Sequence, residues 1–252
     1  MKLFDSFPLK AVPPNLITCI GMTFAFLSIA SSFSGKVDRA AWLVALCVLI
    51  DKLDGTVARR LDATSEFGIQ MDSFSDLVAF GLAPAALIWA AAPVLAPEVW
   101  GYRAAFGPIA ASGVLAALCI LHGLFTALRL AKFNVTAAEH PRVFHGLPST
   151  LSGALISMIF LAAREQAMLT PQVMAVFPAL LGINALLMVS NLPLPKLRRA
   201  SSQLGFVCQV VLGAAIFIVI PLQVFFWLPL AVLVGYIGVG FIIGVRAEVA
   251  AG

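Results

Sequence analysis

The sequence predicts an all-α, polytopic integral membrane protein with about eight transmembrane helices. Of its 252 residues, 61% are hydrophobic and only 11% are charged, and the mean hydropathy is +1.02. A water-soluble domain usually carries about 25% charged residues, so the composition excludes that class. At roughly 20 apolar residues per transmembrane helix, the chain has no room for a separate soluble domain.

Eight long apolar runs account for the predicted helices. In chain order they cover residues 16–34, 40–60, 68–95, 105–133, 147–164, 171–189, 204–220 and 223–245. The breaks between the first seven runs carry charge, proline or glycine, which favours turns there. Only Pro221 and Leu222 separate the last two runs, so the segment Ile220-Pro221-Leu222 must form a tight turn or a kink. A count of seven helices therefore remains open.

The lysines and arginines predict the orientation of the helices. If the N-terminus is cytoplasmic, twelve of the 16 lie on the cytoplasmic side, and the other side keeps Lys36, Arg39, Arg103 and Arg164. Because cytoplasmic loops carry an excess of positive charge, we expect a multi-pass protein of the cytoplasmic (inner) membrane with both termini inside. Membrane lipids then explain the net charge of +4, and we expect no nucleic-acid partner. Residues 1–15 can form a short helix on the membrane surface.

Half of the twelve acidic residues lie between positions 51 and 76. Asp51 and Asp54 are three residues apart, and Asp72 and Asp76 are four apart, so each pair lies on one face of a helix. An unpaired carboxylate near the centre of a bilayer costs roughly 2.5 to 3.5 kcal/mol, which indicates a partner. Four oxygen ligands facing each other across the turn favour Mg²⁺ or Mn²⁺, and the lack of His and Cys in the cluster argues against zinc.

Small residues and a cation accompany the carboxylates. Gly55, Ala58 and Gly68 allow a phosphate group to approach closely, and Arg59 can contact its oxygens. Two divalent ions balance four carboxylates, so a diphosphate can bind without a large net charge, which suits two-metal phosphoryl transfer. The structural alternative is that the aspartates only form ion pairs with neighbouring cations at the membrane interface.

The segment Asp51-x2-Asp54-Gly55-x2-Ala58-Arg59-x8-Gly68-x3-Asp72-x3-Asp76 resembles the signature of the CDP-alcohol phosphatidyltransferase family, with all eight fixed positions filled. The resemblance implies a six-helix core, a homodimer, and four aspartates that hold two divalent ions, with Asp76 as the general base. It also implies that Gly55, Ala58, Arg59 and Gly68 belong to the nucleotide and diphosphate site. We therefore divide the chain into a surface segment (1–15), a family core (16–191) and a C-terminal helix pair (192–252).

Four stretches around this motif, residues 14–18, 71–84, 127–135 and 146–149, resemble the phosphatidylserine synthase branch of the family. That resemblance implies transfer of a phosphatidyl group from CDP-diacylglycerol to L-serine, and it adds Asn15 and Thr18 to the nucleotide site. The sequence departs mildly from the branch at Ala79 and Lys132, where Ser and Arg are common.

The acceptor site is predicted at the end of the fourth helix. Arg129, Lys132 and Asn134 stand there, where cations can bind the carboxylate of serine or further phosphate oxygens. The structural alternative is that Arg129 and Lys132 only anchor this helix end on the cytoplasmic side. Glycerol 3-phosphate, an inositol phosphate or another small alcohol remains possible as the acceptor. A cation pathway in a transporter is the remote alternative.

Overall fold

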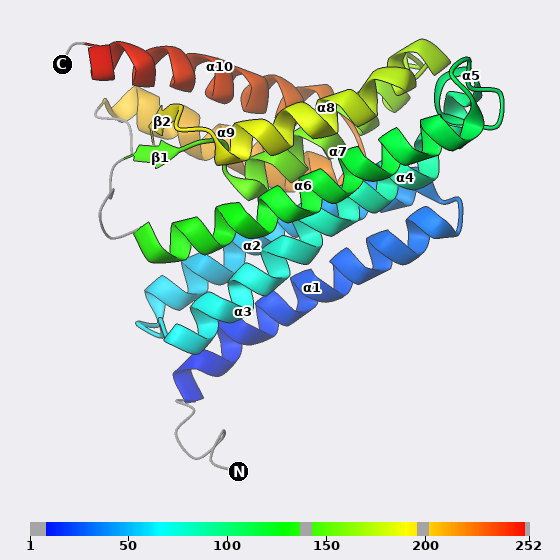
Figure 1. Ribbon diagram of the computed structural model, residues 1–252. Helices are drawn as coiled ribbons and strands as arrows, with labels where there is room; N and C mark the ends of the chain where they lie inside the picture. The colour runs from blue at the N-terminus through cyan, green and yellow to red at the C-terminus, as the bar shows by residue number, and fades with distance from the viewer. Residues whose placement is uncertain (1–8, 137–142, 196–201, 250–252) are drawn as a thin grey trace.

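The chain forms a bundle of long helices (Figure 1) in a computed structural model that describes residues 9–136, 143–195 and 202–249. The helices are η1 (Leu9–Ala11), α1 (Val12–Phe33), α2 (Val37–Arg60), α3 (Glu66–Asp76), η2 (Leu77–Leu82), α4 (Ala83–Leu95), α5 (Pro97–Trp100), α6 (Pro108–Thr136), α7 (Ser149–Glu165), α8 (Pro171–Val189), α9 (Gln203–Leu222) and α10 (Trp227–Val249). Two short strands, β1 (Val143–His145) and β2 (Pro193–Pro195), pair antiparallel and form the only sheet in these ranges. The all-α prediction is confirmed. Most of the predicted surface segment, residues 1–8, lies outside the described residues.

Five helical stretches are long and apolar enough to cross a membrane, which confirms a multi-pass membrane protein. They are α1, the continuous stretch Glu66–Leu95, α6, α8 and α9. The other three predicted segments are helical as well, as α2, α7 and α10. These three helices are not among the five candidate spans, each for its own reason. Charged residues make α2 less apolar, α7 is only 17 residues long, and the apolar part of α10 is limited to the stretch Trp227–Ile243. The count of eight spans therefore stays a prediction.

The turn between the last two helices lies slightly beyond the predicted break. Helix α9 continues through Pro221 to Leu222, and α10 begins at Trp227. The carboxylate of Glu165 in α7 accepts hydrogen bonds from the backbone N–H groups of Phe225 and Phe226, at 2.6 and 2.8 Å. A side chain from another helix therefore fixes this turn.

The third predicted segment is one continuous helical stretch, but it is not a uniform α-helix. The α-helix α3 changes at Leu77 into a π-helical turn, η2, in which the N–H of Ala83 bonds to the carbonyl of Val78. Helix α4 follows, with Pro84 in its first turn. Because proline has no N–H, the carbonyl of Phe80 has no donor four residues later.

Small residues bring α1 and α2 close together. Ala25, Ser28, Ala40 and Ala41 are buried, and the Ser28 hydroxyl donates to the carbonyl of Ala40 at 2.8 Å. Close approach of small residues is the usual mode of helix packing in membranes. At the opposite end of the bundle from this contact lie the first turn of α1, the end of α2, the start of α3 and the β1–β2 ribbon (Figure 1). The acidic cluster is therefore built from chain segments that meet at one end of the molecule.

Candidate active site

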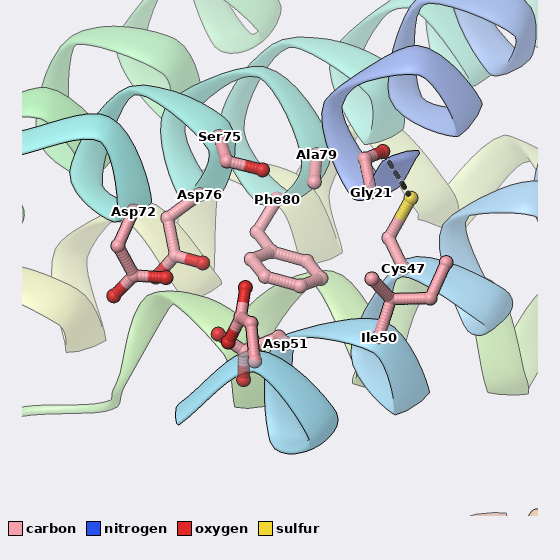
Figure 2. A pocket seen from close by; sticks show the side chains of 10 residues that line it. Gly21, Cys47, Ile50, Asp51, Asp72, Ser75, Asp76, Ala79 and Phe80 are labelled. Atoms are coloured by element: carbon pink, nitrogen blue, oxygen red, sulfur yellow. Dashed lines mark hydrogen bonds between the residues drawn. The ribbon is translucent and has the colours of Figure 1, made fainter. Parts of the chain in front are cut away.

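Three of the predicted metal ligands come together between α2 and α3. Carboxylate oxygens of Asp51, Asp72 and Asp76 lie within 4.8 Å of one another, and Figure 2 shows the three side chains turned toward a common space. The local sequence sets this arrangement, because the Ser65 hydroxyl caps α3 by accepting a hydrogen bond from the N–H of Gly68 at 3.1 Å. The cap fixes where α3 begins and thereby which face carries its two aspartates.

The fourth predicted ligand, Asp54, lies beside this group. It is buried, and its carboxylate accepts hydrogen bonds from the Thr18 hydroxyl at 3.0 Å and from the N–H of Gly55. Asp54 and Asp72 line both the cavity of the acidic cluster and the cavity next to it. Helical spacing thus places Asp54 within the site, while a hydroxyl from α1 holds its carboxylate.

The chemistry of the acidic cavity fits a hard divalent cation. Besides the four aspartates, its lining includes Gly21, Cys47, Ile50 and Phe80 (Figure 2). The thiol of Cys47 donates to the carbonyl of Gly21 at 3.4 Å. The polar groups that remain are mainly carboxylate oxygens, which Mg²⁺ and Mn²⁺ prefer. The cluster can therefore hold a divalent metal ion.

A second cavity, of about 210 Å³, adjoins the first and opens between α1, the end of α2 and the start of α3. It is lined by all six residues predicted for the nucleotide and diphosphate site, namely Asn15, Thr18, Gly55, Ala58, Arg59 and Gly68. Six residues that are spread over more than fifty positions of the sequence therefore face one cavity. The role of these residues in binding a nucleotide stays a prediction.

One feature of this second cavity indicates a polar ligand, and another shows how closely the cavity wall is packed. The amide nitrogen of Asn15 is buried and has no hydrogen-bond partner among the described residues. A methyl group on Gly68 would lie 3.3 Å from the Asn15 amide oxygen and 3.2 Å from the Ser65 hydroxyl. Because buried donors are normally satisfied, the free amide indicates a partner that enters the cavity.

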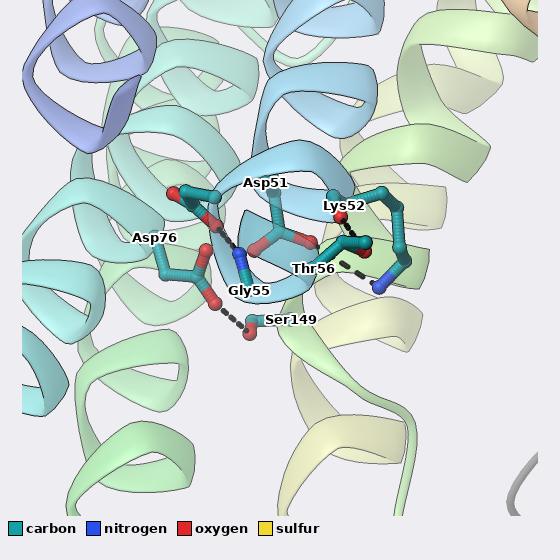
Figure 3. A network of polar contacts seen from close by, with 7 residues as sticks. Asp51, Lys52, Gly55, Thr56, Asp76 and Ser149 are labelled. Carbon is teal, nitrogen blue, oxygen red and sulfur yellow. Dashed lines mark hydrogen bonds and ion pairs between the residues drawn. The ribbon is translucent and has the colours of Figure 1, made fainter. Parts of the chain in front are cut away.

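Hydroxyl groups and one cation hold the carboxylates of the acidic cluster (Figure 3). The Ser149 hydroxyl of α7 donates to Asp76 at 3.2 Å, and Lys52 forms an ion pair with Asp51, also at 3.2 Å. Asp51 thus has a neighbouring cation, as the structural alternative expects, whereas Asp54 and Asp76 accept hydrogen bonds from hydroxyl groups. Ser149 was not among the predicted site residues. It ends the stretch 146–149, which the sequence had singled out only by its resemblance to the family branch.

The structure separates the three predicted acceptor residues. Arg129 is buried on α6, where its Nε donates to the carbonyl of Leu147 at 3.2 Å and its guanidinium lies over the Phe133 ring. It also interacts electrostatically with Asp76.

The other two residues bond to segments that neighbour α6. Lys132 donates to the side chain of Asn191 at 3.2 Å, and Asn134 donates to the hydroxyl of Ser73 at 2.9 Å. Both are exposed. Of the predicted acceptor residues, Arg129 is therefore the one that the fold brings near Asp76, the predicted general base.

Comparison with known proteins gives consistent matches. A family model described as CDP-alcohol phosphatidyltransferase matches residues 11–197. The chain is 31% identical over 211 residues to the CDP-diacylglycerol--serine O-phosphatidyltransferase of Helicobacter pylori, and the matched region covers 83% of each protein. It is 36% identical over 151 residues to the archaetidylserine synthase of Methanothermobacter thermautotrophicus (59% of this chain, 57% of that protein). It is 30% identical over 146 residues to the CDP-diacylglycerol--serine O-phosphatidyltransferase of Bacillus subtilis (58% and 73%).

Proposed function

Since the chain belongs to the CDP-alcohol phosphatidyltransferase family, we propose that it transfers a phosphatidyl group from CDP-diacylglycerol to the hydroxyl of L-serine, giving phosphatidylserine and CMP. One observation carries the proposal: the acidic cluster adjoins a cavity that all six predicted nucleotide-site residues line. The names of the relatives in H. pylori and B. subtilis support serine as the acceptor.

Asp51, Asp72 and Asp76, together with the adjacent Asp54, would hold a pair of Mg²⁺ or Mn²⁺ ions. When bound, such ions supply positive charge that stabilises the diphosphate and the departing CMP. The close grouping of three carboxylates supports this assignment, because like charges at such short range repel one another unless a cation balances them.

The second cavity would bind the nucleotide and its diphosphate. The free amide of Asn15 offers a hydrogen-bond donor to the nucleotide, and Arg59 offers a guanidinium to phosphate oxygens. Thr18 lines the same cavity, and its hydroxyl also orients Asp54. The absence of side chains at Gly55 and Gly68 allows the diphosphate to approach the backbone.

The reacting groups would meet at Asp76. Asp76 takes the proton of the serine hydroxyl as its oxygen attacks the lipid-linked phosphorus; a new P–O bond forms, and the bond to CMP breaks. Ser149 donates to one oxygen of Asp76 and orients the other toward the acceptor. Arg129, whose charge acts on Asp76, would attract the carboxylate of serine.

The remaining features of the proposal concern the assembly and the membrane. We place the enzyme in the cytoplasmic membrane as a homodimer, with its site on the cytoplasmic side. The uneven distribution of lysine and arginine supports the orientation. The family resemblance supports the dimer.

The decisive assay uses the purified protein in detergent with CDP-diacylglycerol, labelled L-serine, and Mg²⁺ or Mn²⁺. Glycerol 3-phosphate and inositol phosphate are tested in parallel. We expect metal-dependent labelled phosphatidylserine with serine alone. Release of CMP only with another alcohol would overturn the serine assignment, and no CMP with any alcohol would favour the cation-transporter alternative.

A further inference from the structure

The π-helical turn η2 begins directly after Asp76 and contains Phe80, whose carbonyl has no backbone donor at Pro84. The side chain of His122 on α6 supplies a donor from another helix. The imidazole is fully buried, and its Nε2 lies 3.0 Å from the carbonyl oxygen of Phe80. Short π-helical turns often occur at functional sites.

The protonation of this ring follows from the two carbonyl groups that it faces. Its Nδ1 lies 3.3 Å from the carbonyl of Leu181 on α8, and a neutral imidazole has only one N–H to donate. The Leu181 carbonyl already has the N–H of Ala185 within its own helix. Residue 84 would supply the donor to the Phe80 carbonyl in an α-helix, and Pro84 cannot, so we assign the proton to Nε2.

Two glycine contacts hold the same turn tightly against α6 and α7. A methyl group on Gly81 would lie 3.0 Å from the Thr126 side chain, and one on Gly153 would lie 2.7 Å from the Phe80 ring. Both distances are at or below the closest approach of ordinary side chains. The π turn therefore has little freedom to shift.

The turn joins His122 to the acidic cluster. The Phe80 ring lines the acidic cavity (Figure 2), and Asp76 lies one turn earlier on the same stretch. We infer that His122 is a positioning residue: its hydrogen bond to the carbonyl of Phe80 fixes the π turn that aims Asp76 at Asp51 and Asp72. The inference rests on the proposed function of these aspartates. The simpler interpretation, a buried histidine that serves packing alone, predicts a loss of stability and nothing else.

Three variants of the full chain test this role. His122→Phe removes the donor. In His122→Gln the new side-chain amide nitrogen can take the place of Nε2. In His122→Asn the shorter side chain brings its amide nitrogen only to the position of Nδ1. Each purified protein is titrated with Mn²⁺ alone, following free Mn²⁺ by electron paramagnetic resonance, and its melting temperature, kcat and KM for serine are measured. If His122→Phe does not fold, the Asn and Gln variants decide the question, since both are polar and similarly small.

We expect the Phe and Asn variants to bind Mn²⁺ about tenfold more weakly or worse, as is typical when a group that orients metal ligands is lost. Their kcat should fall about as much, while the KM for serine changes little. His122→Gln should restore both quantities to near the wild-type values. Ser28→Ala is the matched control, because it removes a buried hydrogen bond to a neighbouring helix at the other end of the bundle. It should lower the melting temperature without changing Mn²⁺ affinity.

Unchanged Mn²⁺ affinity and kcat in a folded Phe or Asn variant would overturn the inference, as would a folded Gln variant as defective as Phe. Failure of the proposed function gives a different result. If the wild-type protein binds Mn²⁺ but makes no phosphatidylserine, the proposed acceptor is wrong, and the Mn²⁺ titrations still decide the role of His122.

Discussion

Hydroxyl groups from distant parts of the chain hold two of the site aspartates. Thr18 donates to Asp54, and Ser149 donates to Asp76. A hydroxyl donor orients a carboxylate without cancelling its charge, and a carboxylate has several acceptor positions. Because each carboxylate oxygen has more than one lone pair, each aspartate keeps its negative charge and an acceptor position for a metal ion or a proton. A lysine or arginine in the same place would compete with the metal.

Replacing Asp76 by Asn removes both a proposed metal ligand and the proposed base. We expect Asp76→Asn to abolish turnover while nucleotide binding largely survives, because the cavity that contains Asn15 and Arg59 is left intact. Phosphatidylserine formation and binding of a cytidine nucleotide measure the two properties separately. Turnover like that of the wild type would exclude Asp76 as the base.

Ser149→Ala should impair catalysis more mildly. Loss of one hydrogen bond to a charged group costs about 1.5 to 3 kcal/mol, which corresponds to a fall of roughly ten- to a hundredfold in kcat if the bond acts only on the base. Ser157→Ala is the control on the same helix, since the Ser157 hydroxyl bonds to the carbonyl of Gly153 within α7. Equal kcat values for the two variants would show that Ser149 does not orient Asp76.

The predicted site residues and the missed one differ in how the sequence encodes them. Asp51 and Asp54, like Asp72 and Asp76, share a face because their spacing matches the helical period. Ser149 is separated from Asp76 by 73 residues, so no local period connects them. The sequence can predict contacts within one helix, but contacts between helices depend on how the bundle packs.

Among the elements, the turn from α2 to α3 shapes the second cavity. Ser65 caps α3, and Gly68 lies against both the Ser65 hydroxyl and the Asn15 amide. The turn therefore aligns the cavity wall with the start of α1. This contact explains physically why the motif needs a residue without a side chain at position 68.

Gly68→Ala should weaken binding of CDP-diacylglycerol. The added methyl group lies 3.2 to 3.3 Å from its neighbours, so the Asn15 amide must shift, and we expect the KM for CDP-diacylglycerol to rise about threefold or more. Gly113→Ala in α6 is the control, because nothing lies within 4 Å of the added methyl group. A KM that rises equally in both variants would mean that contact with Asn15 is not the cause.

The break in the third membrane segment shows what hydrophobic pattern alone cannot predict. Residues 68–95 are almost uniformly apolar, and the pattern indicates a single helix. The structure inserts the π turn η2, where Pro84 removes a backbone donor and His122 of α6 replaces it. The proline is visible in the sequence. The side chain that contacts the Phe80 carbonyl belongs to His122 on another helix, 42 residues from Phe80.

At the scale of the whole molecule, the positive charges divide between the two ends of the bundle. Lys10, Lys52, Arg59, Arg60 and Lys132 belong to segments at the end that carries the acidic cluster, whereas Lys36, Arg39, Arg103 and Arg164 belong to the opposite end. The first turn of α1 and the last turn of α10 also lie at the acidic end (Figure 1). Lys2, Arg142, Lys196, Arg198 and Arg199, which the sequence assigned to the same side, lie outside the described residues.

This division predicts which end faces the cytoplasm. Because cytoplasmic segments are enriched in lysine and arginine, the acidic end should be cytoplasmic. Single cysteines test the two ends: Glu66→Cys lies at the start of α3, and Tyr102→Cys lies in the loop before α6, where the tyrosine is 90% exposed. A membrane-impermeant maleimide should label the first only in inverted vesicles and the second only in spheroplasts.

The parent protein, which retains Cys19 and Cys208 as exposed thiols, gives the background labelling to subtract. The reversed pattern would contradict the proposed orientation, yet it would leave the proposed metal site and transfer reaction as they are. Orientation also constrains the chemistry, because free serine must reach Asp76 from the aqueous phase while the acyl chains of CDP-diacylglycerol stay in the bilayer. A site where α2 ends and α3 begins, at one end of the bundle rather than in its middle, would meet both requirements.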